Sequence, residues 1–250
     1  MVDEAAWGLT AKVAIVTGAA GDIGRRTVEL LSACGACIVA EDVKAEVSGL
    51  EQAGRIATLT GDLVDESTAQ RAVALALQRF GRLDILVNVA GRHMVKSSLD
   101  VTVQDWDGIL NINARGTFLH CREALRVMVP QAGGAIVNVG SISGVVGLGQ
   151  QLAYAASKGA IAQITRVLAV EFGPAGIRVN AVAPGAVVTG ILDGIVPEGR
   201  RLLAGLGEQH ALRRVGRPEE IADVIVYLAS PRSSFITGAI VMADGGYTAM

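Results

Sequence analysis

Short runs of apolar residues alternate along the chain with longer helix-like segments. Runs of strand length lie at Val13–Thr17, Ala36–Ala40, Ala57–Leu59, Ile85–Val89, Ala135–Val139, Arg178–Ala183 and Ile240–Met242. The helix-like segments include Arg25–Ala33, Ser67–Phe80, Trp106–Val129 and Tyr154–Glu171. Glycine or proline marks the ends of these segments, at Gly35, Gly81, Pro130 and Gly173.

This alternation predicts an α/β fold. Strands separated by helices pair in parallel through right-handed crossovers, and the helices cover both faces of the sheet. Because no polar linker interrupts the pattern, we expect a single doubly wound domain of Rossmann type over residues 1–250. Its parallel sheet should have about seven strands. In such a fold a ligand binds beyond the carboxyl ends of the strands.

Composition and charge exclude several classes of partner. The chain is 51% hydrophobic but only 4% aromatic, so Ala, Val, Ile and Leu must build the core, as in buried parallel strands. A formal charge of −2 without a basic run offers no footprint for nucleic acid. No apolar stretch is long enough to cross a membrane, and MVDEAAWGLT lacks the pattern of a signal peptide. We therefore expect neither a nucleic-acid nor a membrane partner.

The three cysteines, Cys34, Cys37 and Cys121, are too sparse for a disulfide framework and favour a cytoplasmic protein. Cys34 and Cys37 form a C-x-x-C, but at a helix carboxyl end, where the helix dipole does not lower a thiol pKa. We interpret them as small buried hydrophobic residues. His93 has no second His or Cys at ligand spacing, so no metal site is expected.

The stretch TGAAGDIG, residues 17–24, joins the first predicted strand to the first predicted helix. Glycines at such a turn let the backbone approach a pyrophosphate at the helix amino end, although glycines also close ordinary strand–helix joints. Asp22 is unexpected, because its carboxylate stands where a phosphate would approach. Asp is favoured at helix amino ends, so we expect its side chain to accept free N–H groups there or to face solvent.

An acidic pair closes the second predicted strand. Asp42 lies 18 residues beyond Gly24, where an acid can hydrogen-bond the adenosine ribose hydroxyls; a solvated acid at a loop start is the alternative. Glu41 beside it adds negative charge that would repel a 2′-phosphate. These residues favour NAD over NADP.

The stretch YAASK places Tyr154 and Lys158 four residues apart, on one face of a helix. A phenol with its ordinary pKa near 10 is a poor base at neutral pH, but a nearby ammonium favours the phenolate. The pair is therefore a candidate general acid/base.

Several motifs occur together in one order and spacing. They are TGAAGDIG at 17–24, NVAG at 88–91, NINARGTF at 111–118, NVGSISG at 138–144, YAASK at 154–158 and VNAVAPGAVVT at 179–189. With them the chain resembles the short-chain dehydrogenase/reductase family over nearly its whole length, from Leu9 to about Tyr247.

The resemblance implies a role for each matching residue. Tyr154 would exchange a proton with the substrate oxygen, and Ser141 would hydrogen-bond the same oxygen. Lys158 would lower the pKa of Tyr154 and hold the nicotinamide ribose. Asn113 would keep a water chain that links Lys158 to solvent. The residues implied in cofactor binding are Gly18, Gly21, Asp22, Ile23, Asp42, Asp62, Leu63, Asn88, Ala90, Gly91, Tyr154, Lys158, Pro184, Gly185, Val187 and Thr189.

Two positions depart from the family pattern. Val89 replaces the second Asn of the family's NNAG, where we expect little effect. Asp22 replaces the middle glycine of TGxxxGxG, which puts in doubt how the loop meets the pyrophosphate.

The substrate side is less specified. We expect Ser143, Gln150 and Gln151 in the substrate pocket, with further candidates at Arg92, His93, Met94, Val145 and Val187. Residues 190–212, which we call the lid segment, are apolar with spaced glycines, as in a closing lid or an ordinary surface helix pair. Arg200 and Arg201 in it could meet an anionic substrate or simply be solvated.

These observations predict an NAD-dependent oxidoreductase that interconverts a secondary alcohol, cyclic or a polyol, and a ketone. One alternative is an NADPH-dependent carbonyl reductase of the 3-oxoacyl-carrier-protein reductase type, although Ala132 and Ala175 stand where such enzymes carry basic residues. Another is a non-catalytic dinucleotide-binding sensor. The resemblance also implies a homo-oligomer, a tetramer or dimer, built on helices 106–129 and 154–171.

Overall fold

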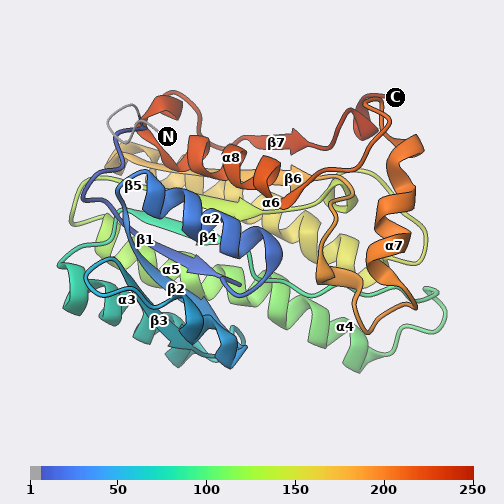
Figure 1. The fold of residues 1–250 in the computed structure, drawn as a ribbon, viewed down its shortest axis with the longest axis horizontal. Coiled ribbons are helices and arrows are strands. Elements are labelled where there is room, and N and C mark those ends of the chain that lie inside the picture. The colour runs from blue at the N-terminus through green and yellow to red at the C-terminus, as the bar shows by residue number, and fades with distance from the viewer. Residues whose placement is uncertain (1–6) are drawn as a thin grey trace.

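The computed structural model describes residues 7–250, which form seven parallel strands in the order β3-β2-β1-β4-β5-β6-β7 (Figure 1). The predicted fold class is therefore confirmed. Residues 1–6, included in the predicted domain and in the stretch without a signal pattern, lie outside the described residues. The strands are β1 (Val13–Thr17), β2 (Cys37–Asp42), β3 (Ile56–Thr60), β4 (Ile85–Asn88), β5 (Gly134–Val139), β6 (Ile177–Pro184) and β7 (Ile240–Ala243).

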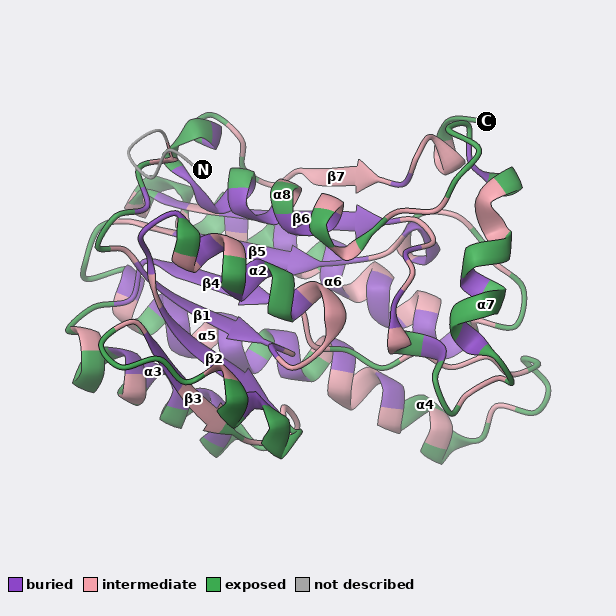
Figure 2. Cartoon of the chain, viewed as in Figure 1, coloured by how far each residue is buried: buried purple, intermediate pink, exposed green. Residues whose placement is uncertain are grey.

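Successive side chains of each inner strand pack alternately into two hydrophobic cores, one on each face of the sheet. Ala14 and Val16 of β1 pack into the cluster on one face, whereas Val13 and Ile15 pack into the cluster on the other. This is the alternation that a pleated strand imposes when both of its faces are covered. The inner strands are accordingly buried along most of their length (Figure 2).

Helices on each face complete the two cores. α2 (Asp22–Ala33) and α8 (Pro218–Ala229) pack together on one face, and α3 (Glu66–Phe80), α5 (Gly116–Met128) and α6 (Leu152–Phe172) cover the other (Figure 1). α4 (Val103–Leu110) and α7 (Gly199–Ala204) lie near the carboxyl ends of the strands. Short helical turns lie at Ala45–Leu50, Asn111–Arg115, Ile142–Gly144, Gly173–Ala175, Gly190–Leu192, Gly205–Gln209, Pro231–Ser233 and Tyr247–Ala249.

The helix expected over 106–129 is two helices. A capping box of Thr102 and Asp105 begins α4 earlier than expected, and a π-helical turn at Asn111–Arg115 separates α4 from α5. A π turn inserts one residue into the helical ladder, a change that hydrophobic spacing does not reveal. It brings Asn113 into the protein interior, where it is fully buried.

Strand order changes direction next to β1, which pairs with both β2 and β4. A ligand crevice forms outside the carboxyl ends of strands at such a switch point. All strands point toward the side where α7 lies (Figure 1). Within residues 7–250, no helix combines the length and apolar character needed to cross a membrane.

The two cores predict a specific loss of stability. Replacing Ile136, fully buried in β5, with Ala should lower the free energy of unfolding by about 2–5 kcal/mol, because it leaves a cavity in a packed core. Urea unfolding would measure this. The matched change Leu99→Ala, at a side chain 97% exposed, should shift the midpoint little; equal losses for both would contradict the assignment of the core.

Candidate active site

Three of the four candidate catalytic residues line one cavity at the carboxyl ends of the strands. Ser141 follows β5, and Tyr154 and Lys158 come from successive turns near the start of α6. The cavity has a volume of about 380 Å³. Leucine, isoleucine and valine side chains make up much of its wall, so a small, mostly apolar molecule fits it.

Tyr154 and Lys158 are both buried, at 6% and 4% exposure. Burial raises the pKa of Tyr154 to about 12, and a hydrogen bond with Ser141 acts in the opposite direction. Burial lowers the pKa of Lys158 to about 8, which leaves its ammonium protonated at neutral pH. The Lys158 Nζ lies 5.7 Å from the Tyr154 ring centroid and donates to the Val139 carbonyl at 2.8 Å. The arrangement can therefore hold a phenol and an ammonium together away from bulk water.

Asn113 does not line the cavity; its side chain hydrogen-bonds two segments next to the cavity. Its Oδ1 accepts from the Arg92 N–H at 2.8 Å, and its Nδ2 donates to the Arg92 carbonyl and the Ser157 Oγ, both at 2.9 Å. These bonds connect the segment after β4 to α6. The water chain expected at Asn113 stays a prediction.

A chain of polar side chains runs along one wall of the cavity. Ser141 Oγ donates to Ser143 Oγ at 3.2 Å, and Ser143 Oγ donates to Gln151 Oε1 at 2.7 Å. Gln151 favours the protonated form of His93, and the His93 ring centroid lies 4.1 Å from that of Tyr154. Ser143 and Gln151 thus both line the cavity, and their contact with a substrate stays a prediction.

The position predicted for Gln150 is wrong. Gln150 is exposed, adopts a left-handed backbone with φ of 63°, and is absent from the residues that line the cavity. The Gln150 carbonyl accepts from the Lys96 N–H at 2.8 Å, so Gln150 connects its own turn to the segment around Lys96. Adjacent residues at a turn point in different directions, which spacing alone did not separate.

His93, only one of several pocket candidates from the sequence, lines the cavity next to Tyr154. Burial lowers the pKa of His93 to about 4, so its imidazole is neutral at neutral pH. Its Nδ1 is buried without a hydrogen-bond partner among the described residues. A buried polar atom without a partner is costly, and a bound substrate group could satisfy it. His93 lies two residues after the NVAG motif, and this position was the available signal.

The glycine-rich loop has the geometry that a dinucleotide needs. Gly18 adopts a left-handed φ of 68°, and a Cβ on it would lie 2.8 Å from the Ala90 backbone. A Cβ on Gly24 would lie 2.1 Å from the Gly18 carbonyl oxygen. Gly21 precedes the first residue of α2 and provides no side-chain cap, so the first N–H groups of the helix stay available to an anion. The loop therefore fits a pyrophosphate group.

Asp42 faces this loop. Its Oδ2 accepts from the Ala20 N–H and its Oδ1 from the Lys44 N–H, both at 2.9 Å. Each carboxylate oxygen keeps a further lone pair, so Asp42 fits the ribose hydroxyls of a dinucleotide.

The role expected of Glu41 is wrong. Its side chain points into the protein, is 1% exposed and meets the His120 Nε2 at 3.0 and 3.1 Å. Successive strand residues point to opposite faces, so only one of Glu41 and Asp42 can face the loop. The Glu41 carboxylate raises the pKa of His120 against the effect of its burial. It therefore does not face a 2′-phosphate.

The other residues implied in adenosine binding surround the loop. Asp62 is exposed and accepts from the Val64 N–H at 3.1 Å, and Leu63 next to it is half-buried. Asn88 is buried at the end of β4, and its Oδ1 lacks a partner among the described residues. Ala90 donates its N–H to the Thr17 Oγ1 at 3.2 Å, while Gly91 lines the cavity.

The residues implied on the nicotinamide side lie at the end of β6 and after it, and all line the cavity: Pro184, Gly185, Val187 and Thr189. His210, a buried residue that the sequence did not single out, hydrogen-bonds this segment. The His210 Nε2 accepts from the Ala186 N–H at 3.2 Å, and its Nδ1 meets the Leu206 carbonyl oxygen at 2.9 Å. These contacts assign His210 the neutral tautomer with its proton on Nδ1.

Asp22 neither caps its own helix nor lies free in solvent, so the orientation expected of it is wrong. Its Oδ2 accepts from the Gly190 N–H at 2.7 Å, across 168 residues of sequence. The same oxygen meets the Arg200 Nη2 at 3.2 Å. Both partners belong to the lid segment, which pattern analysis of a single loop could not reveal.

The lid segment forms a turn at Gly190–Leu192, then α7 and a turn at Gly205–Gln209. Four of its leucines, Leu192, Leu202, Leu203 and Leu206, line the cavity. Its apolar residues therefore form part of the cavity wall, and the role of the segment as a closing lid stays a prediction.

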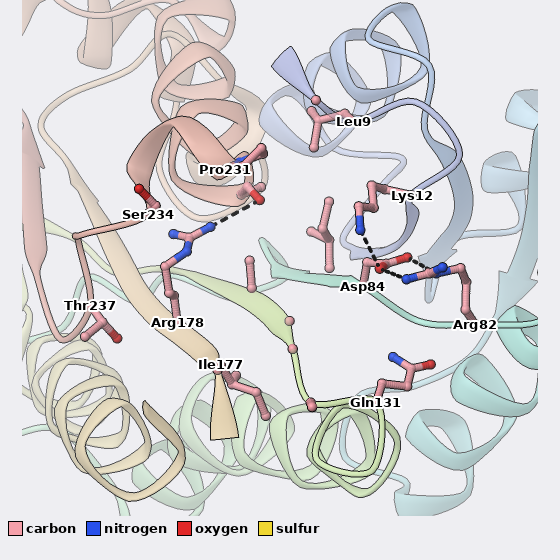
Figure 3. A pocket seen from close by; sticks show the side chains of 18 of the residues that line it. Leu9, Lys12, Arg82, Asp84, Gln131, Ile177, Arg178, Pro231, Ser234 and Thr237 are labelled. Atoms are coloured by element: carbon pink, nitrogen blue, oxygen red, sulfur yellow. Dashed lines mark hydrogen bonds and ion pairs between the residues drawn. The ribbon is translucent and has the colours of Figure 1, made fainter. Parts of the chain in front are cut away.

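A second cavity, of about 600 Å³, lies at the amino ends of the strands (Figure 3). Its charged groups are already paired: Asp84 meets Lys12 at 3.2 Å and Arg82 at 2.6 Å. Arg178 Nη1 donates at 2.8 Å to the Leu228 carbonyl. These contacts occupy the charged side chains at the amino ends of the strands and leave few polar groups for a ligand. Within residues 7–250, no three His, Cys, Asp or Glu side chains cluster as a metal site requires.

Comparison with known proteins identifies the family. A family model described as enoyl-(acyl carrier protein) reductase matches residues 18–248. The chain belongs to the short-chain dehydrogenase/reductase family. The cis-4-hydroxycyclohexanecarboxylate dehydrogenase of Sinomonas cyclohexanicum, a family relative, is 40% identical over 96% of this chain and 97% of its own. The NAD-dependent glycerol dehydrogenase of Listeria innocua is 36% identical over 96% of this chain and 95% of its own.

A solved structure of levodione reductase from the same family superimposes with a TM-score of 0.89 at 33% identity, covering 96% of this chain and 98% of that one. Short-chain dehydrogenases/reductases bind a nicotinamide dinucleotide, and the named relatives act on CH–OH groups or the corresponding ketones. The chain is accordingly an oxidoreductase that interconverts an alcohol and a ketone.

Proposed function

We propose that this chain is an NAD-dependent oxidoreductase that interconverts a neutral secondary alcohol and its ketone, with Tyr154 as general acid/base. One observation carries the proposal: the Tyr154 phenol, the Ser141 hydroxyl and the Lys158 ammonium meet in one enclosed, largely aliphatic cavity. A binding module has no need of such a proton-transfer group.

In the oxidising direction Ser141 and Tyr154 hold the substrate hydroxyl, and the tyrosinate takes its proton. Lys158 keeps a positive charge beside the phenolate in a site of low dielectric, where that charge counts most. NAD supplies the hydride acceptor when bound. In the reducing direction the protonated Tyr154 returns the proton to the ketone oxygen.

The preference for NAD rests on Asp42. Its carboxylate faces the glycine-rich loop, where a 2′-phosphate would bring a second negative charge close to it. The nearby Arg26 is paired with Glu29 at 2.6 Å and with Glu219 at 2.8 Å, so it is not free to meet a phosphate. The NAD dependence named for the Listeria innocua relative agrees with this preference.

The substrate is proposed to be a compact cyclic alcohol or polyol with a second oxygen near the reacting carbon. The His93 Nδ1, next to Tyr154, has no hydrogen-bond partner among the described residues, and the Gln151 amide adds a donor on the same wall. Among the described residues that line the cavity, Lys158 is the only Lys or Arg, which disfavours an anionic group. The glycerol named for the Listeria innocua relative fits this polarity. The hydroxycyclohexanecarboxylate named for the Sinomonas cyclohexanicum relative is a cyclic secondary alcohol but also carries a carboxylate.

Tyr154→Phe tests the reaction directly. The change removes the proton-transfer group but keeps the ring against His93, so turnover should fall at least about a thousandfold while reduced dinucleotide still binds. Steady-state assays of alcohol oxidation would measure the loss of turnover. Fluorescence titration with reduced dinucleotide would measure cofactor binding. Substantial residual turnover would contradict the assignment of Tyr154 as general acid/base.

Ser141→Ala should move the pH dependence. The Ser141 hydrogen bond lowers the pKa of Tyr154, so its loss raises that pKa further and reduces the tyrosinate at any given pH. Alcohol oxidation, which needs tyrosinate, should then rise at higher pH than in the wild type, while ketone reduction keeps its activity to higher pH. The lost hydrogen bond to the substrate should also cost about a hundredfold in kcat. An unchanged pH profile would exclude this coupling.

We further propose a homo-oligomer, a tetramer or dimer, built on α5 and α6. Phe118 of α5 and Val167 and Val170 of α6 are 45%, 50% and 81% exposed, an unusual exposure for large apolar residues on adjacent helices. Light scattering should give a mass of two or four chains, and Val170→Glu should reduce it. A monomer for the unaltered chain would count against the proposal.

A further inference from the structure

The bond between Asp22 and the lid segment is the feature that the proposed reaction does not use. Asp22 is the first residue of α2, at the position where the family pattern has glycine. Through one carboxylate oxygen it receives the Gly190 N–H at 2.7 Å and the Arg200 Nη2 at 3.2 Å. Bonds from a backbone N–H and a guanidinium to one carboxylate are charge-assisted and stronger than neutral ones.

The lid segment is shaped to make this contact. A Cβ on Gly190 would lie 2.7 Å from the Asp193 Oδ2 and 2.9 Å from the Arg200 Nη2. Arg200 also donates from Nε to Asp193 at 3.3 Å, so its guanidinium bridges a carboxylate of the loop and one of the lid segment. A side chain at position 190 would force these groups apart.

The contact lies over the cavity. Ile23, next to Asp22, lines the cavity, and so do Thr189 and Ile191 on either side of Gly190. Opening the lid segment at its first turn therefore requires breaking the bonds to Asp22.

Charge explains how Asp22 can coexist with a pyrophosphate. A lone carboxylate at the amino end of α2 would repel the phosphates that the helix end attracts. Arg200, which also pairs with Asp193, offsets part of this charge, and its Nη1 makes no hydrogen bond to residues 7–250. That group remains available to an anion beside Asp22.

We propose that Asp22 is a positioning residue: with Arg200 it clamps the lid segment over the cavity and offsets its own repulsion of the cofactor pyrophosphate. The first function follows from the contacts of the free protein. The second rests on the proposed dinucleotide binding.

Limited trypsin digestion of the free protein tests the clamp, because Arg200 and Arg201 are cleavage sites inside the lid segment. Asp22→Gly, which restores the family glycine, should speed cleavage after Arg200 or Arg201 roughly tenfold, as followed by mass spectrometry of the fragments. Asp22→Asn, which keeps an acceptor for the Gly190 N–H but loses the charge, should give a smaller increase. Asp193→Ala, which breaks only the ion pair within the lid segment, should change the rate less than about twofold.

Cleavage of Asp22→Gly at the wild-type rate would overturn the clamp. Since this variant could be less stable, Arg200→Gln removes the same bond from the other side. Cleavage after Arg201 in Arg200→Gln should accelerate similarly, with an unchanged thermal midpoint; a wild-type rate there would also count against the clamp.

Titration with reduced dinucleotide tests the charge balance. Arg200→Gln should weaken binding at least about tenfold when Asp22 is present, but less than about threefold in the Asp22→Gly background. Equal losses in both backgrounds would refute the balance. If no variant and not even the wild type binds the dinucleotide, the proposed function fails, whereas the digestion still decides the clamp.

Discussion

The parallel register of four adjacent strands, β1, β4, β5 and β6, sets where the groups of the candidate site lie. Asn88 of β4 and Asn138 of β5 are Cα partners at the strand ends. Asn88 Nδ2 donates to Asn138 Oδ1, and Asn138 Nδ2 donates to the Thr165 Oγ1 of α6, each at 2.9 Å. Because these groups are buried, breaking any bond would leave an unsatisfied polar atom. The hydrogen bonds among Asn88, Asn138 and Thr165 therefore fix the position of α6 along the sheet, so that the first turns of α6 lie at the carboxyl ends of the strands.

From that position α6 brings a phenol and an ammonium into a region with little water. Burial opposes the charged form of both groups, yet the site must hold one positive charge near a phenol that ionises during the proposed reaction. The Val139 carbonyl receives the ammonium, and Ser141 favours the ionised phenol. The lid segment completes the enclosure, so the same apolar wall that admits the substrate also strengthens these interactions.

Hydrophobic spacing was sufficient to predict the strands, α2, α3 and the face of α6 that carries Tyr154 and Lys158, but it did not reveal the break between α4 and α5. Periodicity shows which way a side chain points within its own element, but not what it meets. The partners of Asp22 lie 168 and 178 residues away in the chain, beyond any local pattern. The prediction for Glu41 is wrong because Glu41 and Asp42 are neighbours in a strand, so their side chains face opposite sides. The outward turn of Gln150 depends on a left-handed backbone that composition does not reveal.

The proposed reaction is tested most directly by offering NAD with a panel of neutral cyclic and acyclic diols and matching mono-alcohols, and following the absorbance of reduced nicotinamide. We expect turnover of secondary alcohols, a higher kcat/KM for those with a second oxygen near the reacting carbon, and a lower kcat/KM with NADP on the same substrate. Tight dinucleotide binding without turnover of any alcohol or ketone would contradict the assignment, as would reduction of acyl-thioester ketones alone with NADPH.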